Sequence, residues 1–294
     1  MTALSTLLDS GKPILLDGAM GTMLFDAGLD SGNSPEEWNI LHPDKVKQIH
    51  RAYIEAGSQI ILTNTFGGSA VRLDTHGLSE RVVELNEAAA SLAREEADAA
   101  DKTVVVAGSI GPTGQILQPL GTLSFEDAQK SFQDQAQGLA QGGVDLFWIE
   151  TMSDLEEIKA AIAGVRTISD LPISVTLSFD THGRTMMGIS PELALEALGP
   201  LDIQFLGANC GTGSDELIQA VQELASKNPS IPLIAKANAG IPEFVGDKIV
   251  YNGSPEVMAE YAVTASQEGA RLIGGCCGST PDHIRAMSQA LAKI

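Results

Sequence analysis

Short apolar runs recur along the chain, and each is followed by a segment with helical periodicity or a helix-start signal. Runs such as Thr103-Val104-Val105-Val106 are too apolar for half-exposed strands and are typical of parallel strands buried on both faces. Eight such runs occur, at residues 14–16, 59–63, 103–107, 146–149, 172–177, 203–207, 232–235 and 270–274. The pattern therefore predicts eight strands that alternate with helices.

One helix-start signal occurs four times, as a hydroxyl residue followed by proline and an acid. The hydroxyl caps free amides, proline suits the first turn, and the acid interacts favourably with the helix dipole. The copies are Ser34-Pro35-Glu36, Ser190-Pro191-Glu192, Ser254-Pro255-Glu256 and Thr280-Pro281-Asp282. Ser153-Asp154-Leu155-Glu156 predicts a capping box, and the alanine- and glutamate-rich residues 84–100 predict a long helix.

The 294 residues permit either two domains or one barrel, and no linker-like stretch separates the units. Eight alternating units without a linker predict an α/β fold, a single (β/α)₈ TIM barrel over residues 1–294. Long loops at 25–39, 108–122 and 238–252 follow strands one, three and seven. We expect all three on the C-terminal, catalytic face of the barrel.

The charge and composition exclude several classes of protein. The formal net charge is −20, only 18 residues are Lys or Arg, and there is no basic run, which argues against nucleic-acid binding. No stretch approaches 18 uninterrupted apolar residues, so we expect no membrane span, and residues 1–13 do not resemble a signal peptide. With an odd number of cysteines, these features predict a cytoplasmic protein.

All three cysteines follow predicted strands. Cys210 follows the sixth strand, and the neighbours Cys276 and Cys277 follow the eighth, in glycine-rich turns. These strands are second neighbours around a barrel, and their following loops open on one rim. Three thiolates leave one position of a tetrahedral zinc site open, as catalytic sites do, and sulfur ligands disfavour magnesium and calcium. The pattern predicts a Zn²⁺ site.

Other interpretations of the cysteines remain open at this point. A free cysteine often serves as a small buried apolar residue, and a tight turn can hold cysteines without a metal. A disulfide between Cys276 and Cys277 fits poorly, because neighbouring Cα atoms lie about 3.8 Å apart and disulfides prefer roughly 4.4–6.8 Å.

The end of the first strand offers groups for an amino acid. Asp17 is followed by Gly18, Ala19 and Met20, small or flexible residues whose backbone N–H groups suit a carboxylate, while Asp17 suits an amine. An ordinary strand-to-loop turn is the alternative explanation of this segment.

Polar residues at other strand ends extend this candidate site. Glu150 ends the apolar fourth strand, where we expect it to meet a substrate cation or a structural partner, because an unpaired buried acid is costly. Thr65 and Phe66 follow the second strand, and Asn209 adjoins Cys210, where it can bond a substrate or a ligand sulfur. A thiol-bearing amino acid would match all of these groups.

Two of the five histidines, His182 and His283, lie near rim loops, where we expect a helix-capping or surface role for each. The chain has no Ser/His/Asp ordering, no phosphate-binding Gly-Lys-Ser/Thr motif and no dinucleotide fingerprint.

These motifs resemble the homocysteine S-methyltransferase family over almost the whole chain. The resemblance is carried by residues 17–22, 63–67, 108–114, 209–210 and 274–281. It implies that the three zinc thiolates are Cys210, Cys276 and Cys277 and that the substrate-binding acids are Asp17 and Glu150. Within the family the chain most resembles the homocysteine-binding module of cobalamin-dependent methionine synthase.

The resemblance implies that homocysteine is methylated to methionine by attack of its zinc-bound thiolate, with no further catalytic residue. The branch that uses betaine carries a tyrosine where this chain has Gly67, and a quaternary ammonium needs an aromatic cage. Only 4% of residues are aromatic, and Trp38 is one candidate wall. We therefore expect a methyl-corrinoid donor on a separate corrinoid or folate protein, since the chain ends at Ile294.

Several alternatives remain. The same reaction with betaine or S-methylmethionine as donor is one, and a non-catalytic zinc or thiol redox module is another. A zinc hydrolase is a third, although three thiolates would leave a zinc-bound water poorly acidic. The sequence does not indicate the oligomeric state.

Overall fold

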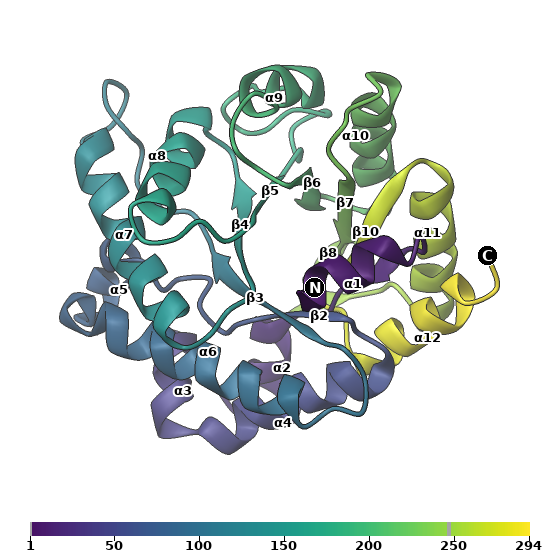
Figure 1. Ribbon diagram of the computed structural model, residues 1–294, viewed down its shortest axis with the longest axis horizontal. Coiled ribbons are helices and arrows are strands. Elements are labelled where there is room, and N and C mark those ends of the chain that lie inside the picture. Colours follow the sequence, from purple (N-terminus) through teal and green to yellow (C-terminus); the bar gives the residue numbers. More distant parts are fainter. Residues whose placement is uncertain (1, 246–247) are drawn as a thin grey trace.

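The computed structural model describes residues 2–245 and 248–294. Eight parallel strands form one sheet in the order β1-β10-β7-β6-β5-β4-β3-β2, and a bridge between Leu16 and Ile60 joins its first and last strands. Figure 1 shows the ring of strands surrounded by helices. This is the (β/α)₈ barrel that the apolar pattern predicts.

Each predicted apolar run forms a barrel strand, with ends that differ by a few residues. The strands are β1 (Ile14–Leu15), β2 (Ile60–Leu62), β3 (Val105–Ile110), β4 (Leu146–Met152), β5 (Ile173–Leu177), β6 (Phe205–Cys210), β7 (Leu233–Ala237) and β10 (Ala270–Gly275). The order confirms that the sixth and eighth barrel strands, β6 and β10, are second neighbours on either side of β7.

Helices occupy the segments between the strands. They are α1 (Ala3–Asp9), α2 (Met20–Asp26), α3 (Trp38–Leu41), α4 (Pro43–Ala56), α5 (Ala70–Leu73), α6 (Val82–Asp98), α7 (Phe125–Gln141), α8 (Leu155–Arg166), α9 (Pro191–Leu198), α10 (Ser214–Ser226), α11 (Pro255–Gln267) and α12 (Pro281–Leu291). Short 3₁₀ turns lie at Pro35–Glu37, Asp74–His76 and Ser79–Arg81. None of the helices in the described residues is long and apolar enough to cross a membrane.

The helix-start signals are confirmed with two differences. Prolines 191, 255 and 281 begin α9, α11 and α12, but the signal at 34–36 begins a 3₁₀ turn. The predicted capping box at Ser153 is wrong, because Asp154 is the N-cap of α8 and accepts a hydrogen bond from the Glu156 N–H. Aspartate suits the N-cap position as well as serine does, so the sequence did not distinguish the two residues.

Alternation along each strand divides the apolar side chains between two layers. In β4, Leu146 and Trp148 belong to a cluster inside the barrel, whereas Phe147 and Ile149 pack with the surrounding helices. Leu4 and Leu7 of α1 join the interior cluster and close its N-terminal end. Polar residues near the other end of the strands therefore surround a site with a packed floor.

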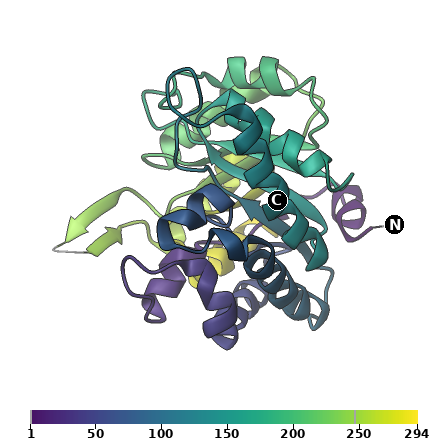
Figure 2. The ribbon, with the colours of Figure 1, turned by 90° about the vertical axis from the view of Figure 1, so that its left-hand side faces the viewer.

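One structured element lies within the predicted loop 238–252. Strands β8 (Pro242–Val245) and β9 (Lys248–Tyr251) form an antiparallel pair. Figure 2 shows this hairpin projecting from the molecule on the side opposite α1. It therefore rises from the barrel face at which the strands end.

Candidate metal and substrate site

The three cysteine sulfurs converge at the C-terminal end of the barrel. The Sγ of Cys210 lies 2.7 Å from that of Cys276 and 3.9 Å from that of Cys277. All three lie within 4.8 Å of one another, and they are the only group of this kind among residues 2–245 and 248–294. Sulfurs bound to one tetrahedral zinc at about 2.3 Å lie roughly 3.8 Å apart. The distance from Cys210 to Cys277 matches this spacing, and the distance from Cys210 to Cys276 is shorter.

Strand β7 determines where these sulfurs lie. Ala237 pairs with Cys210 of β6 on one side and with the end of β10 on the other. The Cys276 N–H donates to the Ala237 carbonyl at 2.6 Å, and the Cys277 N–H donates to the Asn238 Oδ1 at 3.1 Å. Backbone pairing thus orients two adjacent cysteines that an extended strand would direct to opposite faces.

The backbone around the cysteines departs from ordinary strand geometry. Cys210 has a φ of 58°, in the left-handed region that costs a non-glycine residue about 1–3 kcal/mol. Gly278, directly after Cys277, has a φ of 77°, and a Cβ at this position would overlap the Tyr251 ring. Gly278 therefore provides the backbone freedom predicted for this turn.

The three thiols titrate as a group. Hydrogen bonds from Cys210 and Cys276 lower the pKa of Cys277 to about 3. Hydrogen bonds with its two neighbours raise the pKa of Cys210 well above its usual range. The cluster by itself favours a single negative charge, and a divalent cation would allow the remaining thiols to ionise.

A cavity of about 400 Å³ adjoins the cysteines. Its lining includes the three cysteines and seven of the eight predicted substrate residues, which are Asp17, Gly18, Ala19, Met20, Thr65, Phe66 and Glu150. The cavity is large enough for an amino acid and part of a second substrate.

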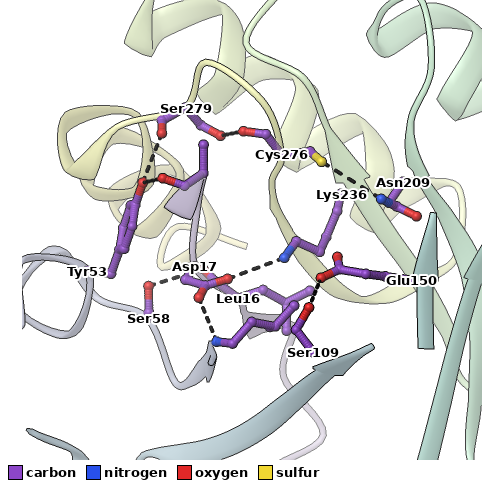
Figure 3. Close-up of polar contacts among 12 residues, drawn as sticks. Leu16, Asp17, Tyr53, Ser58, Ser109, Glu150, Asn209, Lys236, Cys276 and Ser279 are labelled. Atoms are coloured by element: carbon purple, nitrogen blue, oxygen red, sulfur yellow. Dashed lines mark hydrogen bonds and ion pairs between the residues drawn. The ribbon is translucent and has the colours of Figure 1, made fainter. Parts of the chain in front are cut away.

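Asn209 is the predicted substrate residue that does not line the cavity. Its Oδ1 accepts from the Thr151 N–H at 2.9 Å, and its Nδ2 donates to the Thr151 Oγ1 at 2.7 Å. Nδ2 also lies 3.8 Å from the Cys276 Sγ, a contact drawn in Figure 3. Of the two roles considered for Asn209, the geometry favours support of a sulfur.

Asp17 has a buried partner that sequence reasoning missed. Its Oδ1 lies 3.3 Å from the Nζ of Lys236 in β7, and its Oδ2 accepts from the Leu62 N–H at 2.6 Å. Lys236 also lines the cavity. The one available signal was a lysine inside the apolar run Leu233-Ile234-Ala235-Lys236-Ala237, where a buried cation needs an acid.

Glu150 projects into the same part of the cavity from β4. Its Oε1 accepts from the Ser109 Oγ at 2.5 Å. Burial raises the pKa of Glu150 to about 7, although Lys236 and Ser109 counteract part of this effect. Burial likewise raises the pKa of Asp17, with Lys236 acting in the opposite direction.

The segment after Asp17 is fixed to the loop after β10. The Ala19 N–H donates to the Ser279 carbonyl at 3.2 Å, and the Tyr53 hydroxyl donates to the carbonyls of both residues at 2.9 Å. The Ala19 amide is therefore already used. The amides that remain for an anion include that of Gly18 and those of the first turn of α2, which begins at Met20.

Thr65 and Phe66 differ in their surroundings. The Thr65 Oγ1 is buried and donates to the Ser109 carbonyl at 2.7 Å, so it supports the cavity wall. Phe66 is 42% exposed and stands at the mouth of the cavity, against Gly111.

The remaining candidates lie away from the cavity lining. His283 caps α12, with its Nδ1 accepting from the Thr280 N–H at 3.0 Å, and this confirms the predicted capping role. His182 is exposed on a loop. Trp38 packs against His42 and Lys45 and does not line the cavity, so it forms no wall there.

Comparison with known proteins identifies the family. The model of the family "Homocysteine S-methyltransferase" matches residues 14–291. The chain belongs to this family. Its membership classes the protein as a methyltransferase and confirms the resemblance found in the sequence motifs.

Curated relatives include methionine synthases. The chain is 35% identical to that of Mycobacterium leprae (strain TN) over 94% of its length, and 34% identical to that of Mycobacterium tuberculosis over 97%. It spans only about a quarter of the length of these relatives, 24% and 25% respectively.

Among solved structures, the chain resembles the Escherichia coli homocysteine methyltransferase MmuM. The oxidised form of MmuM matches with a TM-score of 0.83 and 25% identity, over 98% of this chain and 99% of that chain. A metallated form of the same enzyme matches with a TM-score of 0.81. The similarity therefore extends over the whole barrel.

Proposed function

We propose that the protein is a zinc-dependent homocysteine S-methyltransferase that makes methionine, with residues 1–294 acting as one homocysteine-binding barrel. Cys210, Cys276 and Cys277 would hold Zn²⁺. The observation that carries this proposal is the convergence of three sulfurs at one end of a cavity whose other end holds buried acids. Family membership favours this reaction over a zinc hydrolase or a non-catalytic redox module.

The donor set fits zinc. Three soft thiolates supply three of four tetrahedral positions, and the cavity lies beside them. Zinc in this site would provide an open position at which a substrate thiol loses its proton near neutral pH. The protein's own contribution is to hold the substrate so that its sulfur faces the incoming methyl group, which can lower the barrier by several kcal/mol.

The cavity offers a place for each group of the amino acid. Glu150 and Asp17 provide negative charge for the ammonium, and the amides at the start of α2, from Met20 onward, provide donors for the carboxylate. Gly18, Ala19 and Thr65 complete the wall. Phe66 at the mouth would limit access of water to the bound thiol.

We favour a methyl-corrinoid as donor, carried by a separate corrinoid or folate protein. Sequence similarity to methionine synthases supports this donor, although the match covers only a quarter of their length. Large apolar side chains exposed on the segments after the barrel strands support a macromolecular partner; they are Phe25, Phe66, Ile116, Leu120, Met186 and Ile241.

Two small donors are alternatives. S-methylmethionine, a methylated sulfonium, is the second candidate. Betaine is less favoured, because among the described residues Phe66 is the only Phe, Tyr or Trp that lines the cavity and a quaternary ammonium needs several aromatic walls. A cytoplasmic location, which would keep the thiols reduced, is part of the proposal.

Replacement of a cysteine tests the proposal. Cys276→Ala should bind zinc at least tenfold more weakly and lose methionine formation from homocysteine with every donor. Thr212→Ala, an exposed change two residues from Cys210, is the matched control and should keep both properties. Metal analysis and an assay with each donor in turn provide the measurements. Full turnover by Cys276→Ala would overturn the assignment.

A further inference from the structure

A buried lysine lies between the two buried acids of the cavity. Lys236 Nζ is 3.3 Å from Asp17 Oδ1, and each of these two side chains is only 4% exposed. Figure 3 shows Lys236 extending from β7 toward Asp17, with Glu150 on its other side. Burial alone would lower the pKa of Lys236, but the charges of Asp17 and Glu150 raise it above its usual range. The lysine is therefore a cation.

The two acids differ in what they still offer a ligand. Each Asp17 oxygen already has a protein partner, because Oδ1 pairs with Lys236 and Oδ2 accepts from the Leu62 N–H at 2.6 Å. Glu150 uses Oε1 for the Ser109 hydroxyl. Its Oε2 makes no hydrogen bond to any residue in 2–245 or 248–294. Among the described residues, Glu150 thus keeps one oxygen with no protein partner, whereas each Asp17 oxygen already has one.

The charges of Asp17, Lys236 and Glu150 also favour Glu150 as the acceptor of a substrate cation. When both carboxyls are ionised, two carboxylates and one ammonium leave a net charge of −1, which matches one monocation. If Lys236 were neutral, an incoming ammonium would meet two uncompensated acids in a buried position, where unpaired charge is costly.

We infer that Lys236 is a positioning residue that binds Asp17 and so leaves Glu150 as the acceptor of the substrate ammonium. The inference rests on the proposed function and refines it. Asp17 then holds Lys236 and does not contact the substrate. Lys236 in turn neutralises one of the two negative charges that the ligand would otherwise meet. The substrate class is a thiol that carries a primary ammonium.

Calorimetry on the zinc-loaded protein tests this division. The ligands are L-homocysteine and 4-mercaptobutyrate, which keeps the thiol and carboxylate but lacks the ammonium. The dissociation constant of 4-mercaptobutyrate divided by that of L-homocysteine measures ammonium recognition. Glu150→Gln should lower this ratio by at least tenfold, because a charged hydrogen bond is lost. All variants should keep their zinc, since neither acid nor the lysine is a ligand.

A double-mutant cycle separates Lys236 from a direct role of Asp17. Asp17→Asn should also lower the ratio by at least fivefold, because the released Lys236 ammonium would pair with Glu150. Adding Lys236→Met should restore the ratio to within about threefold of the wild type, since one free carboxylate is again present. If that protein does not fold, Asp17→Asn with Lys236→Gln replaces it.

The possible results distinguish failure of the inference from failure of the proposed function. A double variant as poor as Asp17→Asn alone would show that Asp17 binds the ammonium directly and would overturn the inference. Equal affinity of the wild type for both thiols would overturn it too, while zinc-dependent thiol binding would stand. If the zinc-loaded wild type binds neither thiol, the proposed function fails together with the inference.

Discussion

Glu150 is a buried carboxyl whose charge changes close to neutral pH, because burial raises its pKa to about 7. The carboxyl is protonated below this value and can no longer attract an ammonium. We therefore expect kcat/KM for homocysteine to fall as the pH decreases from 8 to 6, about tenfold per unit below pH 7. Steady-state kinetics across this range provide the measurement.

The Glu150→Gln variant is the control for this pH dependence. It should be at least tenfold less efficient at pH 8, and its profile should lack the change centred near pH 7. Deprotonation of the homocysteine thiol also depends on pH, but it affects kcat/KM of the wild type and of Glu150→Gln equally. An unchanged profile in the variant would mean that another group titrates.

The sequence identified some residues of the site but not the partners of others. The cysteines were identifiable because an adjacent pair in a glycine-rich turn is hard to explain by packing. The partner of Asp17 was not, because Lys236 lies 219 positions away and only barrel closure brings the two together. Ala19 was expected to offer its amide, but a contact with the distant Ser279 already uses it.

At the scale of elements, the turn after β10 depends on one glycine. Gly278→Ala places a Cβ against Tyr251 and forces a left-handed conformation on alanine. We expect displacement of Cys277 and at least tenfold weaker zinc binding, measured by competition with a chelator. Gly183→Ala is the control, because Gly183 also has a positive φ but has nothing within 4 Å of an added Cβ. Equal zinc affinity of the two variants would contradict the assigned role.

The order of elements followed from the apolar pattern, whereas some boundaries did not. All eight barrel strands lie at predicted runs because strands buried on both faces have an unambiguous composition. The hairpin β8–β9 was expected as a loop, since it is exposed and lacks a long apolar run. Ser153 was chosen over Asp154 as the cap of α8 because both residues suit that position.

At the scale of the whole molecule, the rim around the cavity carries the proposed contact with a protein donor. Leu120 and Met186 are 76% and 73% exposed on loops after β3 and β5. Changing both to aspartate should lower turnover with a methyl-corrinoid protein by at least fivefold. Turnover with free methylcobalamin should change less than twofold, because the cavity is untouched. Equal loss with both donors would contradict a docking role.

The barrel as a whole was predictable, because eight alternating units without a linker admit few other arrangements. The donor was not, because donor specificity depends on the rim, where exposed side chains have no periodic pattern.

The central claim is that three cysteine sulfurs hold zinc and leave one position for the thiol of homocysteine. X-ray absorption at the zinc edge tests it directly, on anaerobically purified protein with and without homocysteine. We predict three sulfur ligands and one lighter atom without substrate, and four sulfurs with substrate, at about 2.3 Å. An unchanged zinc environment on addition of homocysteine, or four sulfurs in its absence, would contradict the account.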